Sequence, residues 1–142
     1  MTLDDLGHVR GALLNLHKAL VDLERADYEL AHGPVSAGKM LQLLIDGDRF
    51  AWLRPISELI VRMDVLMANA NERRRPTAAR PSMTREQVAD ETRALLVETR
   101  LLFTSDEAPR PFRERYLKLL AHHPAMAVLH RAVTGALPVD RR

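Results

Sequence analysis

Apolar residues recur every three or four positions through the first thirty residues of the chain. The members of this series are Leu6, Val9, Leu13, Leu16, Leu20, Leu23 and Leu30. Asp27 occupies the one remaining position of the pattern. This spacing places the series on one side of an α-helix, so the sequence predicts an amphipathic helix of about 28 residues that ends near His32. So long an apolar face needs partners, and it constrains the whole fold.

The segment HGPVSAGKML, residues 32–41, resembles a phosphate-binding loop because it reads G-x-x-x-x-G-K-M from Gly33. A true loop of this kind follows a strand and carries Ser or Thr after the lysine. Here a long helix precedes the segment, and Met40 replaces the hydroxyl residue. We therefore interpret it as a turn between two helices: Gly33 ends the first, Pro34 prevents its continuation, and Ser36 begins the second.

Helical periodicity continues along the rest of the chain, and no segment shows the alternation typical of a strand. The further predicted helices run over 37–45, from Arg49 or Pro55 to Ala70, from a capping box at 84–87 through Phe103, over 112–122, and over 124–135. We predict an all-α fold, a bundle of about four main helices plus one or two short ones, packed antiparallel in chain order.

The domain prediction is a single helical domain over residues 1–142. It contains an N-terminal helical hairpin (1–70), a basic, proline-containing linker (71–83) and C-terminal helices (84–137). Neither half alone carries a large apolar core, which favours one domain over two.

Composition removes several classes of function. The chain has no cysteine, which excludes disulfides, thiolate metal sites and cysteine nucleophiles. No run of apolar residues approaches the length of a membrane span, and the acidic start MTLDDLGHVR is not a signal peptide. We therefore expect a cytoplasmic protein with no membrane association, and no motif implies a cofactor.

Three ionisable residues fall on the inward side of the first helix. His17 and Glu24 lie on its apolar face, and Asp27 occupies a core position. Such groups are costly to bury unless they are paired or bind a metal. One interpretation is a buried ion pair with Arg49 or Arg54.

The other interpretation is a site for a metal, a small ligand or proton transfer. It uses His17, Glu24 and Asp27, with Asp64 meeting His17 if the two helices pack antiparallel. The metal itself is not predicted. Glu29 and His32 have the spacing of a di-iron motif, but the helical projection turns them toward solvent.

The stretch FAWLRPISELI, residues 50–60, concentrates aromatic and cationic side chains. Trp52 is either a binding anchor or a core residue, because it is in phase with the apolar face of its helix. Together with the segments 27–29, 33–34 and 41–44, this stretch resembles a group of small uncharacterised bacterial all-helical proteins with an F-A-W-L-R-P-x-S-x-L-I signature. The resemblance implies no particular activity and indicates Trp52, Arg54 and Ser57 as candidate binding anchors.

A basic patch at Arg73, Arg74 and Arg75 has the charge to contact phosphates. The formal net charge of the chain is only +2, and no aromatic residue interleaves the arginines. The sequence therefore favours a solvated linker over a nucleic-acid site.

No catalytic constellation emerges from these patterns. The leading prediction is a non-catalytic helical bundle that acts through protein–protein or self-association. The first helix is a possible dimer seam, and Val61 and Leu101 fall away from the main apolar faces of their helices. The alternative is a metal- or small-ligand-binding bundle that uses the inward His/Glu/Asp cluster.

Overall fold

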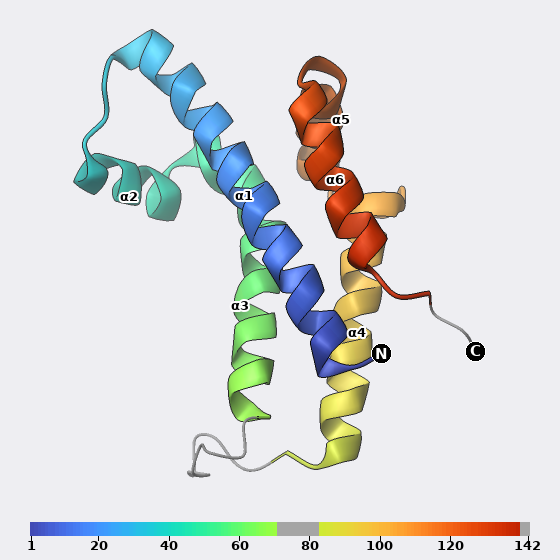
Figure 1. Ribbon diagram of the computed structural model, residues 1–142. Helices are drawn as coiled ribbons and strands as arrows, with labels where there is room; N and C mark the ends of the chain where they lie inside the picture. Colours follow the sequence, from blue (N-terminus) through green and yellow to red (C-terminus); the bar gives the residue numbers. More distant parts are fainter. Residues whose placement is uncertain (71–82, 140–142) are drawn as a thin grey trace.

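The computed structural model of the chain is all-α over the residues that it describes, 1–70 and 83–139 (Figure 1). In chain order the elements are α1 (Leu3–His32), α2 (Ala37–Asp46), the 3₁₀ helix η1 (Asp48–Leu53), α3 (Arg54–Asn69), α4 (Arg85–Thr104), α5 (Arg110–His122) and α6 (Pro124–Ala136). The predicted fold class is confirmed. The patch at Arg73, Arg74 and Arg75 lies outside the described residues.

Side-chain caps begin α1, α2 and α4, and the caps of α2 and α4 are those that the sequence predicts. The Thr84 hydroxyl accepts a hydrogen bond from the backbone N–H of Gln87, and the Gln87 side chain accepts one from the backbone N–H of Thr84. Thr2 and Asp5 form the same reciprocal pair at the start of α1. Each pair satisfies two backbone donors that a helix start leaves unpaired.

The turn between α1 and α2 also has the predicted form. Gly33 has a φ of 81°, a conformation that favours glycine, and its N–H donates to the carbonyl of Glu29 at 2.8 Å. The Ser36 hydroxyl accepts a hydrogen bond from the backbone N–H of Lys39 and so caps α2. The segment that resembles a phosphate loop is therefore a connection between two helices.

The starts of α3 and α5 lie at residues other than those predicted from the sequence. The sequence left Arg49 and Pro55 as alternative starts of the third helix. In the structure a 3₁₀ helix covers Asp48–Leu53, and α3 begins at Arg54. The α5 helix begins at Arg110, two residues before the predicted start. Pro111 is compatible with this start because the first turn of a helix needs no N–H from proline.

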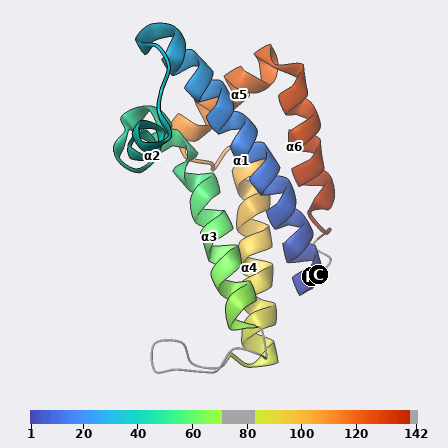
Figure 2. The same ribbon diagram turned by 60° about the vertical axis from the view of Figure 1, so that its left-hand side comes forward.

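The α1 helix lies at the centre of the bundle. It contacts α3 and η1 of its own half and α4 and α6 of the other half, and it crosses in front of α3 and α4 (Figures 1 and 2). The side chains from Leu6 to Leu20 in its apolar series are completely buried. The simple chain-order packing predicted from the sequence is therefore wrong, because α1 also pairs with the last helix.

The dimer seam predicted along α1 stays a prediction. Within the chain, α1 completely buries Leu6, Val9, Leu13, Leu16 and Leu20 of its apolar series. Leu23 is half-buried, and Leu30 has 88% of its surface exposed. Although α1 has 30 residues, no helix of the described ranges is both long and apolar enough to cross a bilayer.

The Gly33 conformation leads to a stability prediction. We expect Gly33→Ala to lower the free energy of unfolding by roughly 1–3 kcal/mol, because a Cβ atom is strained at this φ and ψ. Gly38→Ala is the matched control: it lies in the first turn of α2 with open space around it, and alanine stabilises a helix there by a few tenths to about 1 kcal/mol. Urea unfolding followed by circular dichroism measures both. Equal effects of the two substitutions would contradict the assigned turn.

Candidate functional site

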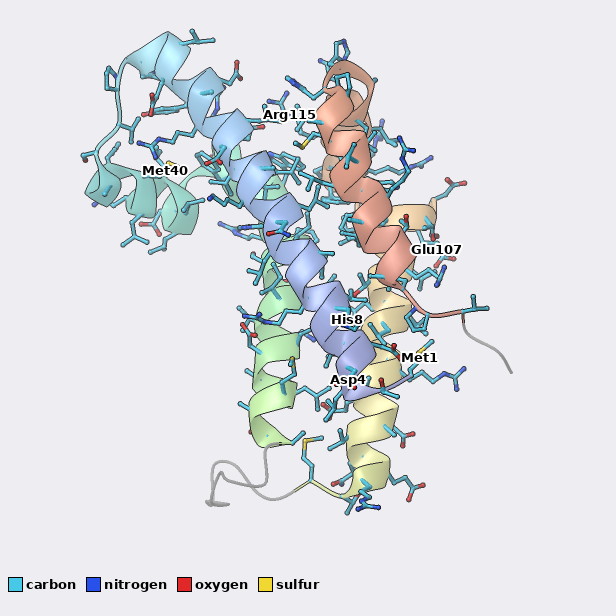
Figure 3. The ribbon with its side chains drawn as sticks, viewed as in Figure 1. Met1, Asp4, His8, Met40, Glu107 and Arg115 are labelled. Atoms are coloured by element: carbon cyan, nitrogen blue, oxygen red, sulfur yellow. The ribbon has the colours of Figure 1, made fainter. Side chains whose placement is uncertain are left out.

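Two places in the structure carry features of a functional site. The first is a group of charged and aromatic side chains around Glu24, here called the Glu24 cluster: Glu24 and Asp27 of α1, Arg49 and Trp52 of η1, and Arg115 of α5. Figure 3 shows Arg115 in the space between the upper part of α1 and the C-terminal helices. The cluster joins three elements that are far apart in the sequence.

Glu24 is the centre of the cluster and only 2% of its surface is exposed. Its Oε1 accepts hydrogen bonds from Arg115 Nε at 2.8 Å and from Trp52 Nε1 at 3.2 Å, and Arg115 Nη2 forms an ion pair with the same oxygen at 2.7 Å. Its Oε2 accepts a hydrogen bond from Arg49 Nε at 3.3 Å. Both carboxylate oxygens are thus satisfied, which is the condition for keeping a charge in an apolar interior.

Asp27 lies at the exposed edge of the same cluster. Its Oδ2 accepts a hydrogen bond from Arg49 and lies 3.8 Å from Arg115. The Arg49 guanidinium also lies over the Tyr28 ring, 5.7 Å from its centroid. Two carboxylates therefore face two guanidinium groups, so the charges balance within the cluster. The ion-pair interpretation agrees with this geometry for Arg49, whereas the pairing suggested for Arg54 is wrong.

His17 and Asp64 do not join the cluster. His17 lies two helical turns before Glu24, about 10 Å along the axis, and is half-buried. Asp64 pairs with Arg10 rather than with His17, so the contact predicted between them is not formed. Within residues 1–70 and 83–139, no three His, Asp or Glu side chains are placed to hold one metal ion.

The three candidate binding anchors have separate environments. Trp52 donates to Glu24 and packs against Phe112, with ring centroids 6.0 Å apart, so it is a partly buried residue at the edge of the core with one polar contact. Arg54 is exposed at the first residue of α3. The Ser57 hydroxyl donates to the backbone carbonyl of Arg54 at 3.2 Å. The three side chains do not converge on one site.

Arg115 is the member of the cluster that sequence reasoning missed. It follows Phe112 by three residues and precedes Leu119 by four, and both of these are buried. Arg115 therefore lies on the apolar side of α5, as Glu24 does on α1. A cation in an apolar stripe is a signal for a buried anionic partner, although the spacing does not identify which one.

A hydrogen bond between Tyr116 and His130 connects α5 to α6. Tyr116 Oη and His130 Nδ1 are 2.7 Å apart, and both rings lie against Phe103. Burial raises the pKa of Tyr116 and lowers the pKa of His130. The geometry therefore fits a protonated phenol that donates to a neutral imidazole.

The second candidate site is a groove between the outward sides of α3 and α4, here called the α3–α4 groove. It consists of two clefts of about 330 and 480 Å³ that share Arg62. Val61 and Val65 on α3 and Leu101 on α4 line it, with 59%, 53% and 42% of their surfaces exposed. The exposure predicted for Val61 and Leu101 is confirmed.

Comparison with protein-family models, with curated proteins and with solved structures finds no match to this chain. The resemblance of the FAWLRPISELI stretch therefore stays a prediction.

The burial of Glu24 predicts a large loss of stability on its removal. We expect Glu24→Ala to lower the free energy of unfolding by about 3 kcal/mol, because Arg49 and Arg115 lose their shared acceptor while remaining partly buried. Glu29→Ala is the control, since the partly exposed Glu29–Arg25 pair contributes at most about 0.5 kcal/mol. Urea unfolding of both variants measures the difference, and losses of equal size would contradict a structural role for the cluster.

The half-buried position of His17 predicts a dependence of stability on pH. Burial lowers the pKa of His17 below its ordinary value of 6.5, so the unfolded chain binds this proton more readily than the folded chain. The folded state should therefore lose stability as the pH falls below about 6.5. His17→Gln should lose less over the same interval. Urea midpoints from pH 7.5 to 5 measure this slope, and identical slopes in both proteins would contradict the prediction.

Proposed function

We propose that this chain is a non-catalytic helical protein that acts by binding another protein, and that the α3–α4 groove is the binding surface. The observation that carries the proposal is the exposure of apolar side chains in both clefts of the groove. Val61 and Val65 are one helical turn apart on α3 and line one cleft, and Leu101 of α4 lines the other. Exposed apolar side chains that gather in one groove are typical of interaction sites.

The contacts of the Glu24 cluster support a structural role for it rather than a binding role. Both oxygens of the buried Glu24 carboxylate are occupied by Arg49, Arg115 and Trp52, so this group is not free to act as a base or as a ligand. An ionised carboxylate that is already fully paired offers little to a substrate. We therefore interpret the cluster as structural and place the function on the groove.

A single ion pair crosses the groove and does not close it. Arg62 Nη1 of α3 donates to Glu98 Oε1 of α4 at 2.8 Å, and about half of each side chain is exposed. Exposed pairs of this kind contribute at most about 1 kcal/mol. A partner can therefore displace or bridge the pair at little cost and contact the apolar floor on both sides of it.

A cross-linking experiment tests the proposal. A photoreactive amino acid at position 61 should cross-link to a specific partner in cells, whereas the same residue at position 128, exposed on α6, should not. The double variant Val61→Asn, Leu101→Asn should lower capture of that partner at least tenfold. Val128→Asn is the matched control because Val128 is equally exposed but distant from the groove.

Four outcomes of these experiments bear on the proposal. Loss of capture in the groove variant alone supports the proposal. Equal capture by the groove variant and the Val128→Asn control overturns it. A monomer at high concentration by light scattering, together with no cross-linked partner, also overturns it. Cross-linking to a second copy of the chain would assign the groove to self-association instead.

A further inference from the structure

The charge around the α3–α4 groove is opposite in sign to that of the whole chain. The described residues that line the two clefts include four carboxylates, those of Glu58, Glu91, Glu98 and Glu107. Figure 3 shows Glu107 on the loop that follows α4. Arg62 is the one cation among these lining residues, whereas the chain as a whole has a formal net charge of +2.

Arg62 is already committed to these carboxylates. Its hydrogen bond to Glu98 raises the pKa of the guanidinium, and the charges of Glu58 and Glu91 act in the same direction. One cation therefore faces several acids, and the groove keeps an excess of negative charge. This excess attracts a cationic partner and repels an anionic one.

The shape of the groove fits a helix. Arg62 and Asp64 project about 200° apart on α3, because successive residues of a helix are rotated by about 100°. Asp64 pairs with Arg10 of α1, while Arg62 pairs with Glu98 of α4, so the groove opens away from α1. The α1 helix packs on the other side of the α3–α4 pair. A second helix can pack in the groove in the same way.

The length of the groove sets the length of its occupant. Its lining residues on α3 run from Pro55 to Asn69, which corresponds to about 21 Å of helix. A helix of roughly 14 residues, or four turns, covers this distance. Apolar residues at positions i, i+4, i+7 and i+11 of such a helix would face Val61, Val65 and Leu101 together.

Charge excludes several occupants of the groove. Two copies that met groove to groove would bring eight carboxylates together, and like charges across an interface are unfavourable. Nucleic acid and anionic membrane surfaces carry the same sign as the groove and are repelled. The remaining chemistry is a protein segment with an apolar face and a basic border.

We propose that the α3–α4 groove binds a cationic amphipathic helix of another protein, with Lys or Arg residues that flank its apolar face and pair with Glu58, Glu98 and Glu107. This inference rests on the proposed protein-binding function and specifies its partner class. The apolar contacts hold the helix, and the carboxylate rim selects its charge.

A peptide selection on the full-length chain tests this inference. The probe is a displayed library of 16-residue helical peptides with an apolar face and randomised flanking positions. We expect the enriched peptides to carry an excess of Lys and Arg on the flanks. Their affinity, measured by fluorescence anisotropy, should fall as salt rises, because partly exposed charge pairs are screened.

Charge variants of the chain supply the matched comparison. Glu58→Gln, Glu98→Gln and Glu107→Gln together should weaken binding of the enriched peptides about tenfold at low salt, since each exposed pair contributes modestly. Asp4→Asn, Asp22→Asn and Asp46→Asn remove the same total charge from exposed positions outside the groove and should leave the affinity within about twofold.

The outcomes separate this inference from the proposed function. The selection can instead enrich neutral or acidic peptides that no longer bind the double variant Val61→Asn, Leu101→Asn. This result overturns the cationic partner but leaves the groove as a binding surface. Peptides that bind equally well to the glutamine triple variant also overturn it. A selection that enriches nothing overturns helix binding, and the cross-linking experiment then decides independently whether the groove binds a protein at all.

Discussion

Burial of the apolar face of α1 is the constraint on which the rest of the structure depends. The apolar side chains Leu6, Val9, Leu13, Leu16 and Leu20 are completely buried because α3, α4 and α6 pack around them. Each buried leucine contributes about 2 kcal/mol relative to an exposed one. The two halves of the chain therefore meet on one long helix and share a single core.

The Glu24 cluster continues this packing where the apolar series of α1 gives way to charge. Apolar contacts tolerate small shifts between helices, whereas hydrogen bonds to a buried carboxylate are directional. Arg49, Trp52 and Arg115 all reach Glu24 only in one placement of η1 and α5 on α1. We infer that the cluster fixes the positions of α1, η1 and α5 relative to one another. These hydrogen bonds tie η1 and α5 to α1.

The α3–α4 groove is what this architecture leaves uncovered. The α1 helix packs on one side of the α3–α4 pair, and α5 and α6 lie over other parts of the core, so the outward sides of α3 and α4 have no neighbour among the described helices. Val61, Val65 and Leu101 remain exposed there, beside a rim of carboxylates. An apolar floor with a charged border combines affinity with a choice of partner, and this combination underlies the function proposed for the chain.

Local signals in the sequence determined the secondary structure and part of the Glu24 cluster. Periodicity identified α1 and its inward Glu24, and cap residues such as Ser36 and Thr84 identified helix starts, because both depend on backbone chemistry within a few residues. Periodicity also placed Asp27 in the core, whereas the structure leaves it exposed at the edge of the cluster. Only the tertiary structure decided that Arg115, 91 residues from Glu24, completes the cluster, that Asp64 pairs with Arg10, and that the acids of α3 and α4 share one groove. Helical periodicity shows that a side chain faces inward, but the partner it meets depends on how distant helices pack.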